Sequence, residues 1–425
     1  MKRVAVGFLL CSSFLWAGSG PKPSESLVIT NVNVVDTRYG EIEPNLTVIV
    51  KDGLIEGITK VAVINTGAHV RVVNASGKYL IPGLWDMNAH LSGPAAAAWS
   101  RKSLFALYLA NGVTGIRNMD ARVDGRLLPA GDLRPEIEAA EPLGGSRPEP
   151  ASPAPALSQR RTIEDLNEVL LACSAQEKEL RDGDLDALAN SDLATHAYIG
   201  SAMWETYDSN KAHDLFIRIA DQATWMVPSL VSVEPPPPDS AEDTPWVRYA
   251  PARYRNSQSH LDTATVLEQM AEAQRDIRLV GDMRRAGVQF LTGTNAPSPQ
   301  LFPGFALHRE LDLLVQSGFT ALQALQASTF NPALYMLKLD KYGVVEPGHV
   351  ADLVLLDENP LDDIANTHKV AGVVLRGTYL PRADLDAMLR RVEQEANQQT
   401  GAAKAADTNN DQPTHSAPGT EIRHR

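Results

Sequence analysis

The 425-residue chain has only two cysteines, Cys11 and Cys173, and it is short of positive charge. Cys11 lies in an apolar N-terminal run, and removal of that run would leave Cys173 alone, which excludes an intrachain disulfide. The 39 lysines and arginines are outnumbered by 52 aspartates and glutamates, so the formal net charge is -13. Because nucleic-acid binding needs a basic face, this balance argues against a nucleic-acid partner.

Long apolar runs are also scarce. The main one, residues 4–17, follows Lys2 and Arg3 and precedes small residues. It is shorter than the roughly 20 residues that a membrane-spanning helix needs, and its layout is typical of a secretory signal peptide. We therefore predict a signal peptide over residues 1–19, a periplasmic or secreted mature protein, and no stable membrane span after cleavage. An uncleaved anchor is the alternative.

Both ends of the remaining chain are rich in short runs of β-branched residues, such as 46–50 near the start and 370–375 near the end. Such runs, bounded by turn signals like Lys51-Asp52-Gly53, favour strands. We therefore predict one small composite β domain from residues 20–80 and 340–380.

The C-terminal region changes character within a few residues. Residues 382–392 show the apolar spacing of an amphipathic helix, whereas residues 393–421 contain no large apolar residue. A segment of this composition cannot bury a core. We therefore predict that residues 381–425 form a C-terminal helix followed by a disordered tail.

Several motifs between these ends resemble one family. They lie in the same order as in the imidazolonepropionase-like branch of the amidohydrolase superfamily, and the resemblance covers most of residues 26–380. The segments that carry it are Tyr79-Leu80-Ile81-Pro82-Gly83-Leu84-Trp85-Asp86-Met87-Asn88-Ala89-His90-Leu91 and residues 111–117, 162–166, 286–296, 303–310, 327–332 and 343–354.

This resemblance implies an α/β fold in which residues 81–339 form a TIM-barrel-like (β/α)8 domain. It also implies hydrolysis of non-peptide or dipeptide-like C–N bonds in a small-molecule substrate. The cofactor would be a divalent metal ion, zinc first, held by imidazoles and carboxylates at the C-terminal ends of the barrel strands. In this chemistry the metal activates a water molecule and an aspartate on the last strand accepts its proton.

Four positions depart from the family pattern. Asn88 replaces the first histidine of a His-x-His pair and leaves His90 alone, while Asp165 replaces the histidine of an Ile-Glu-His-Leu motif. Asn295 and Asn118 stand where the family has aspartates. An amide is a poor ligand for zinc and has no titratable lone pair near neutral pH, so Asn295 cannot act as a general base.

A proline-rich stretch interrupts the predicted barrel near residues 141–161, with prolines at 142, 148, 150, 153 and 155. No strand or helix can run through this spacing of prolines. The family would place about three strands there, including two further metal-ligand positions. We therefore predict an incomplete barrel with exposed sheet edges, which leaves association into a homo-oligomer open.

The candidate site residues each have two interpretations. His90, Asp165 and Asn88 are the metal-ligand candidates, Asn295 would orient water or substrate, and His308 would contact substrate at the pocket rim. The alternatives are a strand-end hydrogen bond for His90, a helix start for Asp165, a turn for Asn295 and a helix surface for His308.

Two functions follow from this comparison. The first is a metal-dependent amidohydrolase with an eroded metal site. The second is a catalytically inactive pseudoenzyme that needs no cofactor and binds a small molecule or another subunit. One imidazole and one carboxylate fall short of the three protein ligands that usually hold a catalytic zinc, so the residues favour the second function, whereas the lineage favours the first.

Overall fold

The structure is a computed structural model that describes residues 26–61, 70–91, 95–119, 138–140, 161–189, 200–234, 246–251, 254, 263–298 and 300–410. The predicted signal peptide lies outside the described residues, and so does all of the proline-rich stretch except Arg161. Among the described residues, we find no helix with the length and apolar character needed to cross a bilayer.

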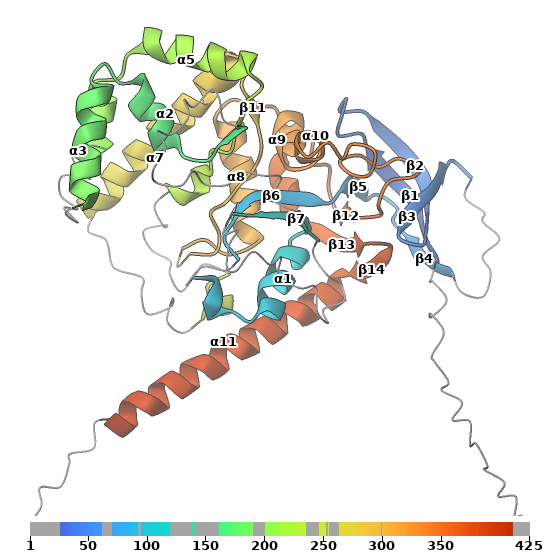
Figure 1. Cartoon of the computed structure of the whole chain (residues 1–425). Helices are drawn as coiled ribbons and strands as arrows, with labels where there is room; N and C mark the ends of the chain where they lie inside the picture. The colour runs from blue at the N-terminus through green and yellow to red at the C-terminus, as the bar shows by residue number, and fades with distance from the viewer. Residues whose placement is uncertain are drawn as a thin grey trace, which may run out of the picture.

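One eight-stranded sheet contains strands from both β-rich ends of the chain (Figure 1). Its strands, in spatial order, are β14 (Thr378–Pro381), β13 (Val370–Leu375), β12 (Leu353–Leu356), β5 (Tyr79–Pro82), β1 (Ser26–Val35), β2 (Ile42–Lys51) and β3 (Leu54–Thr59), with β4 (Val70–Asn74) paired to β1. The two ends meet where β12 runs antiparallel to β5, with Leu355 opposite Leu80. This arrangement agrees with the shared sheet expected from the sequence, whereas the domain boundaries stay a prediction.

Six short parallel strands of the described residues form an open arc, fewer than the eight strands of a complete (β/α)8 barrel. The first three are β6 (Leu84–Ala89), β7 (Val113–Asn118) and β8 (Glu138–Ala140), and the other three are β9 (Thr162–Ile163), β10 (Trp225–Met226) and β11 (Gln289–Phe290). A parallel bridge between Ala89 and Ala296 joins the two sets beside β6 and β11. The described residues contain no closed barrel. The proline-rich stretch lies between β8 and β9, and prolines interrupt strand hydrogen bonding.

The side chain of Arg117 on β7 contacts strands of both three-stranded sheets. Its Nε donates to the Met87 carbonyl of β6 at 2.7 Å, and its Nη2 donates to Glu164 Oε1 just after β9 at 2.7 Å. Nη1 lies 3.3 Å from the Thr162 hydroxyl of β9. Arg117 therefore links β6 and β7 of one three-stranded sheet to β9 of the other sheet, although β9 has no backbone pairing with β6 or β7.

Helices surround the arc. They are α1 (Arg101–Ala110), α2 (Leu166–Cys173), α3 (Glu177–Ala189), α5 (Ser209–Asp221), α7 (Thr263–Arg285), α8 (Phe305–Gln316), α9 (Ala321–Ser328) and α10 (Phe330–Tyr335), with 3-10 turns η1 (Ala96–Ala98), η3 (Leu230–Ser232), η4 (Val247–Tyr249) and η5 (Ile364–His368). Helices α1, α2, α5 and α9 begin after a residue whose side chain caps the first turn. Thr320 and Gln323 form a reciprocal capping box at the start of α9. In Figure 1 the helices α2, α3, α5 and α7 gather on one side of the molecule.

The last helix, α11 (Arg382–Asn410), continues well past residue 392 and packs against α1. A buried stripe at helical spacing makes this contact, formed by Leu385, Leu389, Val392 and Ala396. Glu395 also accepts hydrogen bonds from the Ser100 and Ser103 hydroxyls at the start of α1. The sequence predicts a disordered tail from Glu393, whereas α11 continues to Asn410, and Glu395 and Ala396 extend the contact that the large apolar residues begin.

Candidate functional site

The C-terminal ends of β6 and β11 bring three of the five candidate residues together. His90 Nε2 lies 2.9 Å from Asn295 Oδ1. The backbone N–H of Asn295 donates to the Asn88 carbonyl at 2.8 Å. Because an amide oxygen only accepts hydrogen bonds, this arrangement puts the proton of a neutral His90 on Nε2 and its lone pair on Nδ1. The strand-end hydrogen bond expected as the alternative for His90 is present.

A fourth residue, Ser229, joins this group from the segment after β10. Asn88 is 3% exposed, and its Nδ2 donates to Ser229 Oγ at 3.0 Å. We call Asn88, His90, Ser229 and Asn295 the arc mouth. Sequence reasoning missed Ser229, although a polar residue two positions after the buried Val227 that follows β10 could have drawn attention to it.

Two residues of the arc mouth have a left-handed backbone, with φ of 48° at Ser229 and 60° at Asn295. This conformation is unfavourable for residues other than glycine and persists only where surrounding contacts impose it. Asn295 therefore does occupy the turn expected as its alternative. Both of these residues direct polar side chains to the end of β6, so their backbone conformation helps to place the polar groups of the arc mouth.

Asp86 connects the two strands beneath the arc mouth and was also missed. Its fully buried carboxyl accepts from the Thr294 hydroxyl at 2.6 Å and from the N–H groups of Asn88 and Thr294, each at 3.2 Å. Burial raises the pKa of Asp86 to about 7, although these hydrogen bonds oppose the shift. The carboxyl group therefore acts as a brace between β6 and the segment after β11.

Glu310 on α8 is a second buried acid near Asp86. Its Oε2 accepts from the Val231 N–H at 2.9 Å, and the carboxyl also accepts from the Leu230 N–H. Burial raises the pKa of Glu310 to about 8, and the negative charges of Asp86 and Glu234 add to the shift. Its Oε1 has no hydrogen-bond partner among the described residues.

His308 lies inside the protein, and the expectation of a pocket rim or a helix surface is wrong. The side chain is 1% exposed. Its Nδ1 lies 3.0 Å from the Thr367 hydroxyl, and its Nε2 lies 3.0 Å from the Asn111 carbonyl. Burial lowers the pKa of His308 to about 3. A neutral imidazole with both nitrogens engaged by the protein links α8 to η5 and to the end of α1.

Asp165 is exposed and caps α2, where it accepts from the Asn167 N–H at 2.8 Å. This is the helix start expected as its alternative. Asn118 lies at the end of β7, and its side chain accepts from the Leu91 N–H at 3.0 Å. Throughout the part of the chain that the structure describes, no three histidines, cysteines, aspartates or glutamates group together as a metal site would require.

These donors do not fit a zinc ion held by the protein. A catalytic zinc usually takes three ligands from imidazoles, thiolates and carboxylates. The arc mouth offers the imidazole of His90, which is bonded to Asn295, and otherwise amides and a hydroxyl. The residues of the arc mouth therefore lack the three imidazole, thiolate or carboxylate ligands that a catalytic zinc usually takes.

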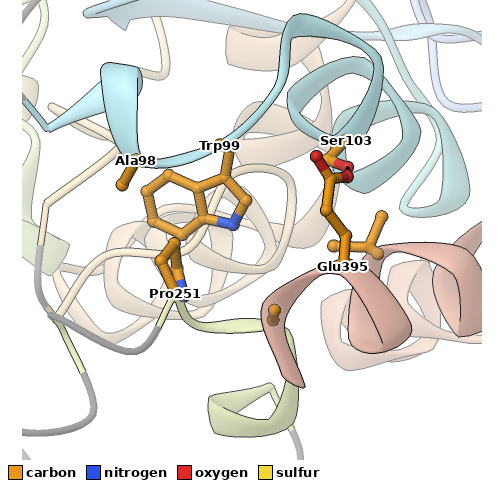
Figure 2. Close-up of a pocket in the computed structure, with 7 residues that line it drawn as sticks. Ala98, Trp99, Ser103, Pro251 and Glu395 are labelled. Atoms are coloured by element: carbon orange, nitrogen blue, oxygen red, sulfur yellow. Dashed lines mark hydrogen bonds between the residues drawn. The ribbon is translucent and has the colours of Figure 1, made fainter. Parts of the chain in front are cut away.

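A small pocket lies elsewhere, between η1, α1 and α11 (Figure 2). Its lining residues are Ala98, Trp99, Ser103, Pro251, Val392, Glu395 and Ala396. Figure 2 shows the Glu395 carboxylate directed toward Ser103 beside the Trp99 ring. The Trp99 indole N–H donates to the Tyr249 carbonyl. Since its polar groups already bond to the protein, we assign this pocket to the packing of α11.

The described residues form a mixed α/β fold in which parallel strands alternate with helices and polar residues lie at the C-terminal ends of the strands. Residues 254–380 match the model of the amidohydrolase family. This match confirms the superfamily predicted from the motifs, whereas the imidazolonepropionase-like branch stays a prediction.

Individual relatives support the fold more than a specific activity. A segment of 69 residues is 41% identical to a dihydroorotase of Trichlorobacter lovleyi and covers 16% of this chain and 16% of that protein. The structure of a bottromycin amidohydrolase is 18% identical, with a TM-score of 0.53, and covers 89% of this chain and 91% of that one. A putative prolidase from Bifidobacterium longum is 19% identical, with a TM-score of 0.51, over 87% and 99%.

Proposed function

We propose that this protein is a non-hydrolytic member of the amidohydrolase superfamily that binds a small polar molecule at the arc mouth. The observation that carries the proposal is the 2.9 Å contact between His90 Nε2 and Asn295 Oδ1. In the family, the position of His90 holds a metal ligand and the position of Asn295 holds the proton acceptor. Here the two side chains hydrogen-bond to each other.

The nearby acids do not replace the missing base. Asp86 and Glu310 are fully buried and accept hydrogen bonds from backbone N–H groups. A general base must reach the proton that it abstracts, directly or through one water. Both carboxyls are committed to bracing the strands and the turn beside the arc mouth, so neither is presented to a substrate.

The side chains of the arc mouth suit a neutral ligand with both donors and acceptors. Asparagine amides, a serine hydroxyl and an imidazole can exchange their mutual hydrogen bonds for bonds to an amide or a ureide. These compounds belong to the C–N class that the resemblance implies for the lineage. Because residues 1–19 predict a signal peptide, we propose that binding takes place outside the cytoplasm.

The second candidate is metal-dependent hydrolysis, which two observations favour. The amidohydrolase family is generally metal-dependent, and His90 keeps an imidazole at the end of β6. A bound divalent ion, zinc first, would supply an activated water molecule. In that case His90 would hold the ion, and Asn295 would orient the water rather than accept its proton.

Metal content of the purified mature protein separates the two candidates. After mild dialysis, elemental analysis should find zinc well below one equivalent in the wild type, in His90→Ala and in His213→Ala. His213 lies exposed on α5 and serves as the matched control. One equivalent of zinc in the wild type and in His213→Ala, lost in His90→Ala, would establish the hydrolase candidate instead.

A further inference from the structure

The turn that carries Ser229 is held from beneath by α8. We call residues 229–232 the strap, because this turn lies beside β6 and includes η3. Glu310 accepts hydrogen bonds from the N–H groups of Leu230 and Val231, the two residues that follow Ser229. The Ser229 hydroxyl in turn accepts from Asn88. A continuous chain of contacts therefore runs from α8 through the strap to the arc mouth.

The strap needs this support because of its backbone. Ser229 is left-handed, with a φ of 48°, and a serine adopts that conformation only when neighbouring contacts impose it. Glu310 binds the first free N–H groups of η3, and these contacts fix the orientation of the residue before them. Without them, the backbone of Ser229 would relax and its hydroxyl would leave Asn88.

The charges around Glu310 make this support releasable. Asp86 on β6 and Glu234 just after the strap are both acidic and disfavour a negative charge on Glu310. The nearby cation, Arg309 on α8, is bonded to Glu234, with its Nε 2.8 Å from Glu234 Oε2. A neutral carboxyl forms weaker hydrogen bonds than a carboxylate, and Glu310 Oε1 still has no partner among the described residues.

We infer that Glu310 is a positioning residue that holds the strap over β6, and that a ligand reaches Asn88 only when the strap moves away. The second half of this inference rests on the proposed binding function. The first half concerns the protein alone. Glu310 does not touch the ligand in this arrangement, and it acts through Leu230, Val231 and Ser229.

Amide hydrogen exchange of the full chain without ligand tests the support. Glu310→Met removes the acceptor and keeps a similar volume, and it should raise exchange at the Leu230 and Val231 amides about tenfold or more, with β6 and α8 unchanged. Glu310→Gln keeps a carbonyl acceptor and should retain most of the protection. Glu268→Met, the same substitution at an exposed position of α7, is the matched control.

Unchanged protection of the strap in Glu310→Met would overturn the inference. An equal rise in exchange over α8, β6 and the strap would also overturn it, because Glu310 would then be an ordinary core residue. Should Glu310→Met not fold, Ser229→Ala tests the same chain of contacts from its other end. The Asn88 side-chain amide should then exchange faster, and unchanged exchange would again contradict the inference.

Ligand binding is measured separately, by calorimetry with hydantoin as the ureide probe. Glu310→Met should bind this probe more tightly than the wild type does, because less free energy is needed to move the strap. No binding by either protein, together with loss of strap protection, would remove the proposed function and leave the positioning role standing. Binding equal in the two proteins would overturn the gating half of the inference.

Discussion

Buried acids beside the arc mouth make the stability of this protein depend on pH. Glu310 has a pKa raised from its usual 4.5 to about 8 in the folded protein. The folded state therefore keeps a proton that the unfolded chain loses between these two values. The stabilising contribution of protonated Glu310 is complete below about pH 4.5 and is lost as the pH rises through about 8.

Replacing Glu310 by glutamine should remove this part of the pH dependence. The free energy of unfolding of the wild type should fall between about pH 5 and about pH 8, and it should fall less in Glu310→Gln, since glutamine has no proton to lose. Urea unfolding at both pH values measures the difference. Glu268→Gln, at an exposed position, should follow the wild type, and parallel behaviour of Glu310→Gln would contradict the assignment.

Some positions of single residues could be predicted from the sequence, and others could not. The grouping of Asn88, His90 and Asn295 was predictable because parallel strands present their C-terminal ends at one edge. The burial of His308 was not, because its partners Asn111 and Thr367 come from distant parts of the chain. Sequence spacing contains no sign of such tertiary contacts.

At the scale of elements, local signals succeeded where a few neighbouring residues decide the structure. The capping box at Thr320 and Gln323 and the turn at Asp52 and Gly53 are both present. The helix after residue 392 was not predicted, because composition alone favoured disorder there. Its continuation depends on Glu395, whose contacts with Ser100 and Ser103 are tertiary.

The packing of α11 on α1 should contribute measurably to stability. Leu385 is fully buried in this contact, and Leu385→Ala should lower the free energy of unfolding by about 2–5 kcal/mol through lost burial and the remaining cavity. Leu267→Ala is the matched control, because Leu267 is 61% exposed on α7, and it should change stability by less than about 0.5 kcal/mol. Equal effects in chemical denaturation would show that α11 is only loosely docked.

At the scale of the whole molecule, the open arc limits what substitutions can restore. The mixed α/β class and the superfamily were readable from ordered motifs, whereas the six-stranded arc was not. The interruption at the prolines stays a prediction, and the contact of Arg117 with Glu164 depends on how β7 and β9 approach one another. A contact between side chains that are distant in the sequence leaves no periodic pattern of residues from which it could be predicted.

Restoring the family residues at the arc mouth should therefore not restore a metal site. Asn88→His combined with Asn295→Asp would return two ligand types, but the sequence predicts that two further ligand positions are lost at the proline-rich stretch. We expect no stoichiometric zinc in the double variant by elemental analysis or calorimetric titration. Uptake of one equivalent would show that other residues of the arc can complete a metal site. Loss of that zinc when His90→Ala is added would show that these residues bind the ion together with His90.

The pairing of β5 with β12 has a consequence for the order of folding. Leu80 lies opposite Leu355 in this pair, so the eight-stranded sheet cannot be completed until the chain has been synthesised beyond β12. Closing such a long loop is entropically costly and slows folding. A nascent chain would stay without its complete eight-stranded sheet until the residues of β12 emerge.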